Sequence, residues 1–143
     1  MNNINHLHPM VVHFPIALII TAFVFDMIWL LNKKDVILSK IGYYLMIAGT
    51  VTLAFAFTTG YVAAMSLTES KVKAVMERHE TYGLITLFIM VIASMIRLYL
   101  VNKKMEESKY MWLMYGIYFI GVVSLVITGL LGGHMVFNFM VVR

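Results

Sequence analysis

Four long apolar segments constrain the fold of this chain more than any other feature of its sequence. They cover residues 10–31, 41–65, 82–101 and 112–131, and the connections between them are short. A helix needs about 20 apolar residues to cross the hydrocarbon core of a bilayer, so each segment is long enough. Only 13% of the residues are charged, against about 25% in a typical soluble domain. We therefore predict an all-α four-helix transmembrane bundle, with residues 1–143 forming a single membrane domain.

The distribution of basic residues predicts the orientation of the bundle. Seven Lys and Arg residues lie in or near the first and third connections, and four lie on the other side. Because cytoplasmic connections carry an excess of Lys and Arg, both termini are expected on the outer, periplasmic side of a bacterial inner (cytoplasmic) membrane. The first segment is not expected to be a cleaved signal peptide, since no positive charge precedes it and Asp26 lies inside it. The net charge of +4 follows this distribution and does not indicate nucleic-acid binding.

Two charged residues lie inside the apolar segments, where an unpaired charge is costly. Asp26 lies seven residues before Lys33, and Arg97 lies six residues before Lys103. At 1.5 Å per residue both are about 9–11 Å above the inner boundary of the membrane. We expect an ion pair between the first and third helices. One pair is not a pathway, so a structural role is a better hypothesis than a proton relay.

All the histidines fall on the same predicted side of the membrane. His79 shares a helix face with Arg97, because eighteen residues make five turns, and it is therefore expected to point into the bundle. His13 is expected more than one helical turn deeper in the membrane than His8, His79 and His134, and it needs a polar partner at that depth. Since Pro15 lacks the N–H of a regular helix, we expect an irregular segment between Pro9 and Pro15. The five histidines are His6, His8, His13, His79 and His134.

A pair of histidines on facing helices is what a b-type haem needs, because the iron takes two axial nitrogens and the macrocycle lies between helices. We take His13 and His79 as the preferred axial ligands. His8 is the first substitute, or a donor that orients a ligand. Arg78 is a candidate partner for the haem propionates. The leading hypothesis is a membrane haem b protein that transfers electrons near the outer face.

Two other functions remain open from the residues alone. His8, His79 and His134 lie at one level and could bind copper or zinc. Alternatively, the protein could itself be a structural or assembly subunit without a cofactor, with its glycine-rich second and fourth helices as docking surfaces. The chain has no cysteine, which excludes iron–sulfur clusters and covalently attached c-type haem. With no nucleophile triad, phosphate loop or zinc-protease motif, an accessory subunit of a redox complex is favoured over a stand-alone enzyme.

The sequence also contains a weak internal repeat. Leu31-Asn-Lys-Lys34 ends the first apolar segment, and Val101-Asn-Lys-Lys104 ends the third. Thr59-Gly60 and Thr128-Gly129 occupy similar places in the second and fourth. This pattern predicts two helical hairpins of parallel orientation, related by an axis along the membrane normal.

Several motifs resemble those of one known family. The chain contains His8-Pro-Met-Val-Val-His13-Phe-Pro-Ile-Ala-Leu18, Asp26, Thr59-Gly60, His79, Arg97 and Gly129-Leu-Leu-Gly-Gly133, in this order over nearly its whole length. In this pattern it resembles the domain-of-unknown-function family 2231 of predicted membrane proteins. The resemblance implies a four-helix membrane domain in which His8, His13 and His79 are motif histidines, whereas His134 lies where the pattern is looser. Some members occur alongside c-type cytochrome modules, which implies electron transfer with other redox subunits. Residues 135–143 depart from the glycine-rich tail of the family.

Overall fold

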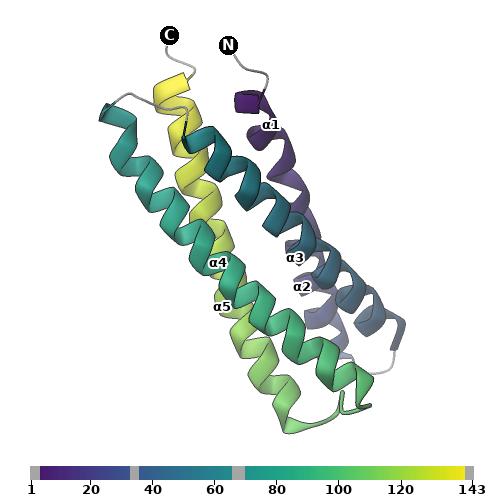
Figure 1. Ribbon diagram of the computed structural model, residues 1–143. Coiled ribbons are helices and arrows are strands. Elements are labelled where there is room, and N and C mark those ends of the chain that lie inside the picture. The colour runs from purple at the N-terminus through teal and green to yellow at the C-terminus, as the bar shows by residue number, and fades with distance from the viewer. Residues whose placement is uncertain (1–3, 33–35, 66–69, 141–143) are drawn as a thin grey trace.

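The fold is built from helices that cross one another at shallow angles (Figure 1). The computed structural model describes residues 4–32, 36–65 and 70–140, and these contain no strand. Four stretches are long and apolar enough to span a membrane: His8–Leu31, Val36–Ala64, Lys73–Asn102 and Lys109–Asn138. The predicted all-α four-helix transmembrane bundle is therefore confirmed. The elements are α1 (Ile4–Val11), α2 (His13–Leu31), α3 (Val36–Ala64), α4 (Ser70–Asn102), α5 (Lys109–Met135) and a short π-helix, η1 (Val136–Met140).

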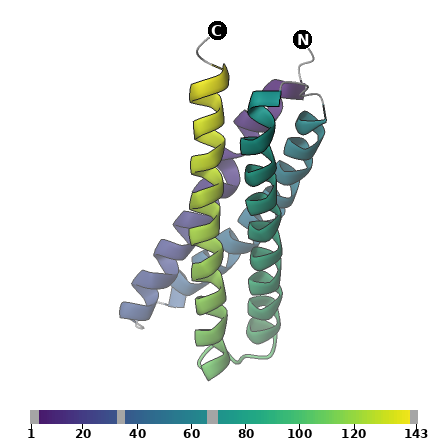
Figure 2. The same ribbon diagram turned by 90° about the vertical axis from the view of Figure 1, so that its left-hand side faces the viewer.

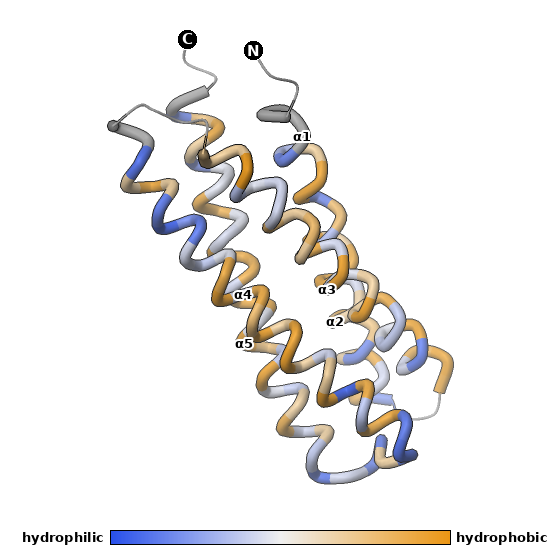
Figure 3. The backbone as a smooth tube through the Cα atoms, in the orientation of Figure 1, coloured by the Kyte–Doolittle hydropathy of each residue, from blue (hydrophilic) through white to orange (hydrophobic). Residues whose placement is uncertain are grey.

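Helix α4 is longer than the third apolar segment. It begins at Ser70, about three turns before the predicted start of that segment at residue 82. Hydropathy identifies only the part of a helix that lies in hydrocarbon, and the first turns of α4 are polar (Figure 3). No Gly or Pro occurs between residues 70 and 82, so nothing in the sequence stops the helix there. As a result His79 lies well inside α4 and is held on a regular helix.

The first span is interrupted at one residue. Helix α1 ends at Val11 and α2 begins at His13, with Val12 as a turn between them. Pro15 lies in the first turn of α2, where a missing N–H is tolerated. The predicted irregularity between Pro9 and Pro15 is thus limited to a single residue, and α1 continues the direction of α2 (Figure 1).

The helices form two antiparallel hairpins. One consists of α1 and α2 packed along α3, and the other of α4 packed along α5. The two hairpins contact each other through α3 with α4 and through α2 with α5. The start of α1, the end of α3, the start of α4 and the end of α5 all lie at one end of the bundle, which we call the terminal end (Figures 1 and 2).

Close helix contacts recur at equivalent places in the two hairpins. A Cβ added at Gly49 of α3 would lie 2.6 Å from Cγ1 of Ile19, and one added at Gly121 of α5 would lie 2.8 Å from Sδ of Met90. Ile19 and Met90 are 71 residues apart, and Gly49 and Gly121 are 72 apart. Glycine allows helices in lipid to approach closely. In each hairpin a glycine of the second long helix packs against a large side chain of the first. The two hairpins are therefore structural repeats.

Asp26 of α2 and Arg97 of α4 form a bidentate ion pair that joins the two hairpins. Nη1 of Arg97 donates to Oδ2 of Asp26, and Nη2 donates to Oδ1 at 2.6 Å. Nη2 also donates to the Ser39 carbonyl at 3.1 Å. The rings of Tyr43 and Tyr115, which are equivalent in the repeat, each have their centroid 5.8 Å from Cζ of Arg97. Both charged residues are fully buried, so each charge is neutralised by the other inside the protein.

Removing one member of this pair is expected to destabilise the bundle strongly. In Asp26→Leu the guanidinium of Arg97 stays buried without its counter-ion, and the free energy of unfolding should fall by about 3–5 kcal/mol. Asp26→Leu combined with Arg97→Met should recover most of that loss, because no charge is then left in the core. Unfolding in mixed micelles with increasing dodecyl sulfate measures both. A double variant as unstable as the single one contradicts this account.

Gly42 allows α3 to pass next to the carboxylate of Asp26. A Cβ at Gly42 would collide with Oδ1 of Asp26, whereas one at Gly116 of α5 would have no atom within 4 Å. We expect Gly42→Ala to lower the free energy of unfolding by about 1–3 kcal/mol through overpacking. The matched control Gly116→Ala should be neutral, or stabilising by up to about 1 kcal/mol, because alanine favours the helix. Equal effects of the two substitutions in the same unfolding assay would show that Gly42 is not needed for the approach.

Candidate functional site

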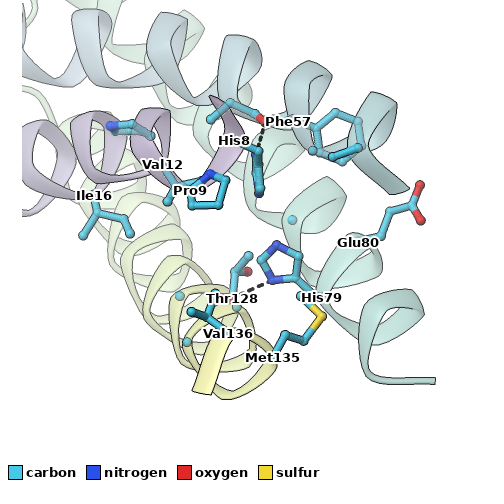
Figure 4. Close-up of a pocket in the computed structure, with 18 of the residues that line it drawn as sticks. His8, Pro9, Val12, Ile16, Phe57, His79, Glu80, Thr128, Met135 and Val136 are labelled. Atoms are coloured by element: carbon cyan, nitrogen blue, oxygen red, sulfur yellow. Dashed lines mark hydrogen bonds between the residues drawn. The ribbon is translucent and has the colours of Figure 1, made fainter. Parts of the chain in front are cut away.

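His8 of α1 and His79 of α4 face each other at the terminal end of the bundle. Their ring centroids are 6.1 Å apart, and the ring planes are inclined at 73° (Figure 4). Like Ile19 and Met90, they are 71 residues apart and equivalent in the repeat. One histidine from each hairpin therefore meets its own counterpart between the hairpins.

Both rings are held by backbone carbonyls of the neighbouring helix. Nδ1 of His8 lies 3.0 Å from the Ala56 carbonyl oxygen and 3.2 Å from Oγ1 of Thr59. Nδ1 of His79 lies 3.0 Å from the Thr128 carbonyl oxygen. Because a carbonyl only accepts, Nδ1 must donate in both rings, and each Nε2 keeps a lone pair. Metal-binding histidines are commonly oriented in this way.

Glycine lets each ring approach the helix that holds it. A Cβ added at Gly60 would lie 2.8 Å from Cε1 of His8, and one added at Gly132 would lie 3.1 Å from Cε1 of His79. These contacts show that Gly60 corresponds to Gly132 in the repeat, and not to Gly129 as the Thr-Gly match in the sequence indicated. The two imidazole positions are thus constructed in the same way in both hairpins.

The two rings lie in a cavity of about 400 Å³ between the hairpins. Its walls come from all the helices and are mainly apolar, with Phe57, Ile16 and Leu125 among the larger side chains. Glycine and alanine form much of the remaining surface, so the space between the hairpins is not filled by side chains. This lining leaves room for an apolar ligand beside the two imidazoles. The glycine and alanine residues of the lining are Ala56, Gly60, Ala63, Ala64, Gly83, Gly129, Gly132 and Gly133.

The other predicted site residues lie around this pair. His13, the first residue of α2, is exposed and lines the same cavity, but its ring is not in contact with His79 as that of His8 is. Arg78 is exposed on α4, and His134 is exposed near the end of α5. Neither of these two lines the cavity. The structure therefore brings together His8 and His79, with His13 next to them.

A three-histidine metal site is not assembled in the part of the chain that the structure describes. There, no group of three or more His, Cys, Asp or Glu side chains could hold a metal ion. The hypothesis of a copper or zinc site formed by His8, His79 and His134 is not supported by this geometry. The side chain of His6 lies outside the described residues. Haem iron needs only two protein nitrogens, because the macrocycle supplies the others.

The pairing of His8 with His79 was not predicted from the sequence, although a signal for it was present. His8 precedes Asp26 by eighteen residues, and His79 precedes Arg97 by the same number. Eighteen residues are five helical turns, so each histidine shares a face with a member of the ion pair. The expected irregularity at Pro15 obscured this spacing in the first span.

Comparison with known proteins identifies the family of this chain. The model of a family described as "Predicted membrane protein (DUF2231)" matches residues 5–143. The chain belongs to this family. The family description of DUF2231 names a membrane protein and no activity, so the function must be argued from the site. No curated protein and no solved structure matches the chain.

The hydrogen bonds of the two rings predict their tautomers. At alkaline pH, in protein prepared without ligand, His8 and His79 should carry the proton on Nδ1, because each donates from Nδ1 to a carbonyl. The exposed ring of His13 should show a mixture of the two neutral tautomers. Nitrogen-15 NMR of histidine-labelled protein, assigned through His8→Ala and His79→Ala, measures this. Protonation of His8 and His79 on Nε2 would contradict the structure.

Proposed function

We propose that this DUF2231 protein binds haem b between its two hairpins, with His8 and His79 as axial ligands, and transfers electrons through it. The separation of the two imidazoles is the observation that supports this most directly. A metal ion bonded at about 2 Å to two opposed imidazole nitrogens places those nitrogens about 4 Å apart, and the ring centroids about 6 Å apart. The observed separation of 6.1 Å agrees with that value. The carbonyl bonds of Nδ1 leave the two Nε2 atoms available for the iron.

The cavity has the character that such a ligand requires. It is mainly apolar, and glycine and alanine leave room beside both imidazoles. No Lys or Arg among the described residues lines it. The propionates of the haem would therefore extend toward water at the terminal end, where Arg78 is exposed and available as a counter-ion.

In this proposal His8 takes the place first assigned to His13. The ring of His13 is exposed, and it makes no hydrogen bond to a described residue. The ring of His8 is held by the Ala56 carbonyl at the position equivalent to that of His79. In this proposal His13 contributes only to the lining of the cavity.

The proposed orientation follows the distribution of basic residues. With seven Lys and Arg on the opposite side and four on the terminal side, the terminal end faces outward from a bacterial inner membrane. The connections are too short to form a soluble domain. A haem supplies one-electron chemistry, so electrons are exchanged with other membrane or periplasmic redox proteins.

Substitution of either facing histidine is expected to abolish the haem spectrum. We expect wild-type protein from haem-replete cells, purified in mild detergent, to give a reduced-minus-oxidised spectrum of low-spin, bis-histidine haem. His8→Ala and His79→Ala should each lose that spectrum, because one axial nitrogen is missing. The matched controls His13→Ala and His134→Ala should retain it.

The outcomes separate this proposal from its alternatives. A flat spectrum of the wild-type protein at full haem supply overturns it and favours a subunit without a cofactor. Copper or zinc found by elemental analysis in a colourless protein favours the metal-binding hypothesis. Loss of the spectrum in His13→Ala, with retention in His8→Ala, would return the ligand role to His13.

A further inference from the structure

The two facing imidazoles are held by unequal sets of acceptors. Nδ1 of His79 lies 3.0 Å from the carbonyl oxygen of Thr128, the only acceptor that it reaches among the residues that the structure describes (Figure 4). Nδ1 of His8 has two acceptors, the carbonyl oxygen of Ala56 at 3.0 Å and Oγ1 of Thr59 at 3.2 Å. The N–H of His8 is therefore shared between a carbonyl and a hydroxyl.

The hydroxyl of Thr59 is oriented to accept this bond. Oγ1 of Thr59 donates its own hydrogen to the Ala56 carbonyl at 2.8 Å, so its lone pairs remain for the ring of His8. A hydroxyl that donates one hydrogen bond is polarised and becomes a stronger acceptor of another. Thr59 is also buried, so its hydroxyl does not turn toward water instead. The ring, the hydroxyl and the carbonyl form a closed set of hydrogen bonds.

The second hairpin lacks the equivalent of this hydroxyl. Ala56 corresponds to Thr128, because each supplies the carbonyl that holds a ring, and the two lie 72 residues apart. By the same spacing Thr59 corresponds to Leu131, whose side chain cannot accept a hydrogen bond. The two histidine positions, which are otherwise constructed in the same way, therefore differ in this one polar group.

We propose that Thr59 is a positioning residue that fixes the imidazole of His8, and that His8 is therefore the more firmly held of the two ligands of the cavity. The ring of His8 must give up two acceptors to turn, whereas the ring of His79 must give up one. The ligand role rests on the proposed function. The difference in ring mobility does not, since it belongs to the protein without any ligand.

Exchange of the Nδ1 protons with water tests the role of Thr59 in ligand-free protein. Nitrogen-15 NMR of histidine-labelled protein at alkaline pH measures it for each ring. Thr59→Val should speed the exchange of the His8 proton by about two- to tenfold, the effect of one hydrogen bond, and leave that of His79 unchanged. Thr59→Ser keeps the hydroxyl and should stay close to wild type. So should the matched control Thr58→Val, an exposed neighbour whose hydroxyl donates to the Ala54 carbonyl.

The repeat also offers the reverse substitution. Leu131→Thr places a hydroxyl three residues after Thr128, as Thr59 lies three residues after Ala56. We expect it to slow the exchange of the His79 proton by about the same two- to tenfold and to leave that of His8 unchanged. A role of Thr59 in helix packing alone does not produce this gain at the other ring.

Titration of haem into single-histidine variants tests the ligand role. The protein His79→Ala retains His8, and it should bind haem with a Kd about tenfold lower than His8→Ala, which retains His79. Adding Thr59→Val should remove this advantage from His79→Ala and should leave the Kd of His8→Ala as it was. Thr58→Val should affect neither variant.

The outcomes separate the failure of this role from that of the proposed function. A wild-type protein that binds no haem overturns the proposed function, and the proton exchange still decides whether Thr59 fixes His8. Equal exchange of the His8 proton in Thr59→Val and Thr58→Val overturns the positioning role. With haem bound by the wild type, equal Kd values for His79→Ala and His8→Ala overturn His8 as the more firmly held ligand.

Discussion

The ion pair between Asp26 and Arg97 is the interaction on which the arrangement of the two hairpins depends. A charge left alone in hydrocarbon is so costly that these two residues have to meet inside the bundle. Each lies on the first long helix of its hairpin, so their contact sets the height and rotation of one hairpin against the other. Five turns away on the same helices, His8 and His79 are brought opposite each other. The ion pair near one end of the bundle therefore positions the candidate site at the other end.

The internal repeat explains why both contacts lie between the hairpins. In a two-fold arrangement a residue near the axis meets its own counterpart. At one pair of equivalent positions the two hairpins carry opposite charges, Asp26 and Arg97. At another pair they carry the same residue, His8 and His79. Two identical lone pairs gain nothing from each other, but they can bond a single metal ion placed between them. The identity of the two copies at His8 and His79 agrees with a shared ligand.

The terminal end of the bundle contains two neighbouring hollows of different character. Around the histidines the walls are apolar and lined by small residues, which favours a flat cofactor and excludes water. Beside them lies a groove of about 530 Å³ on α3 and α4, which shares Phe57, Tyr61 and Glu80 with the histidine cavity.

The sequence alone determined the four spans, the common depth of Asp26 and Arg97, the gathering of the histidines at one end and the pairing of helices into repeated hairpins. These follow from hydropathy and from distance along a helix, which are local properties of the chain. Only the tertiary structure decided that His8, and not His13, lies opposite His79, and that Gly60 corresponds to Gly132. Those outcomes depend on how little the chain bends at Val12 and on how closely glycine lets neighbouring helices approach. Rotation and contact between helices are set by packing across the whole bundle, and no spacing within a single segment specifies them.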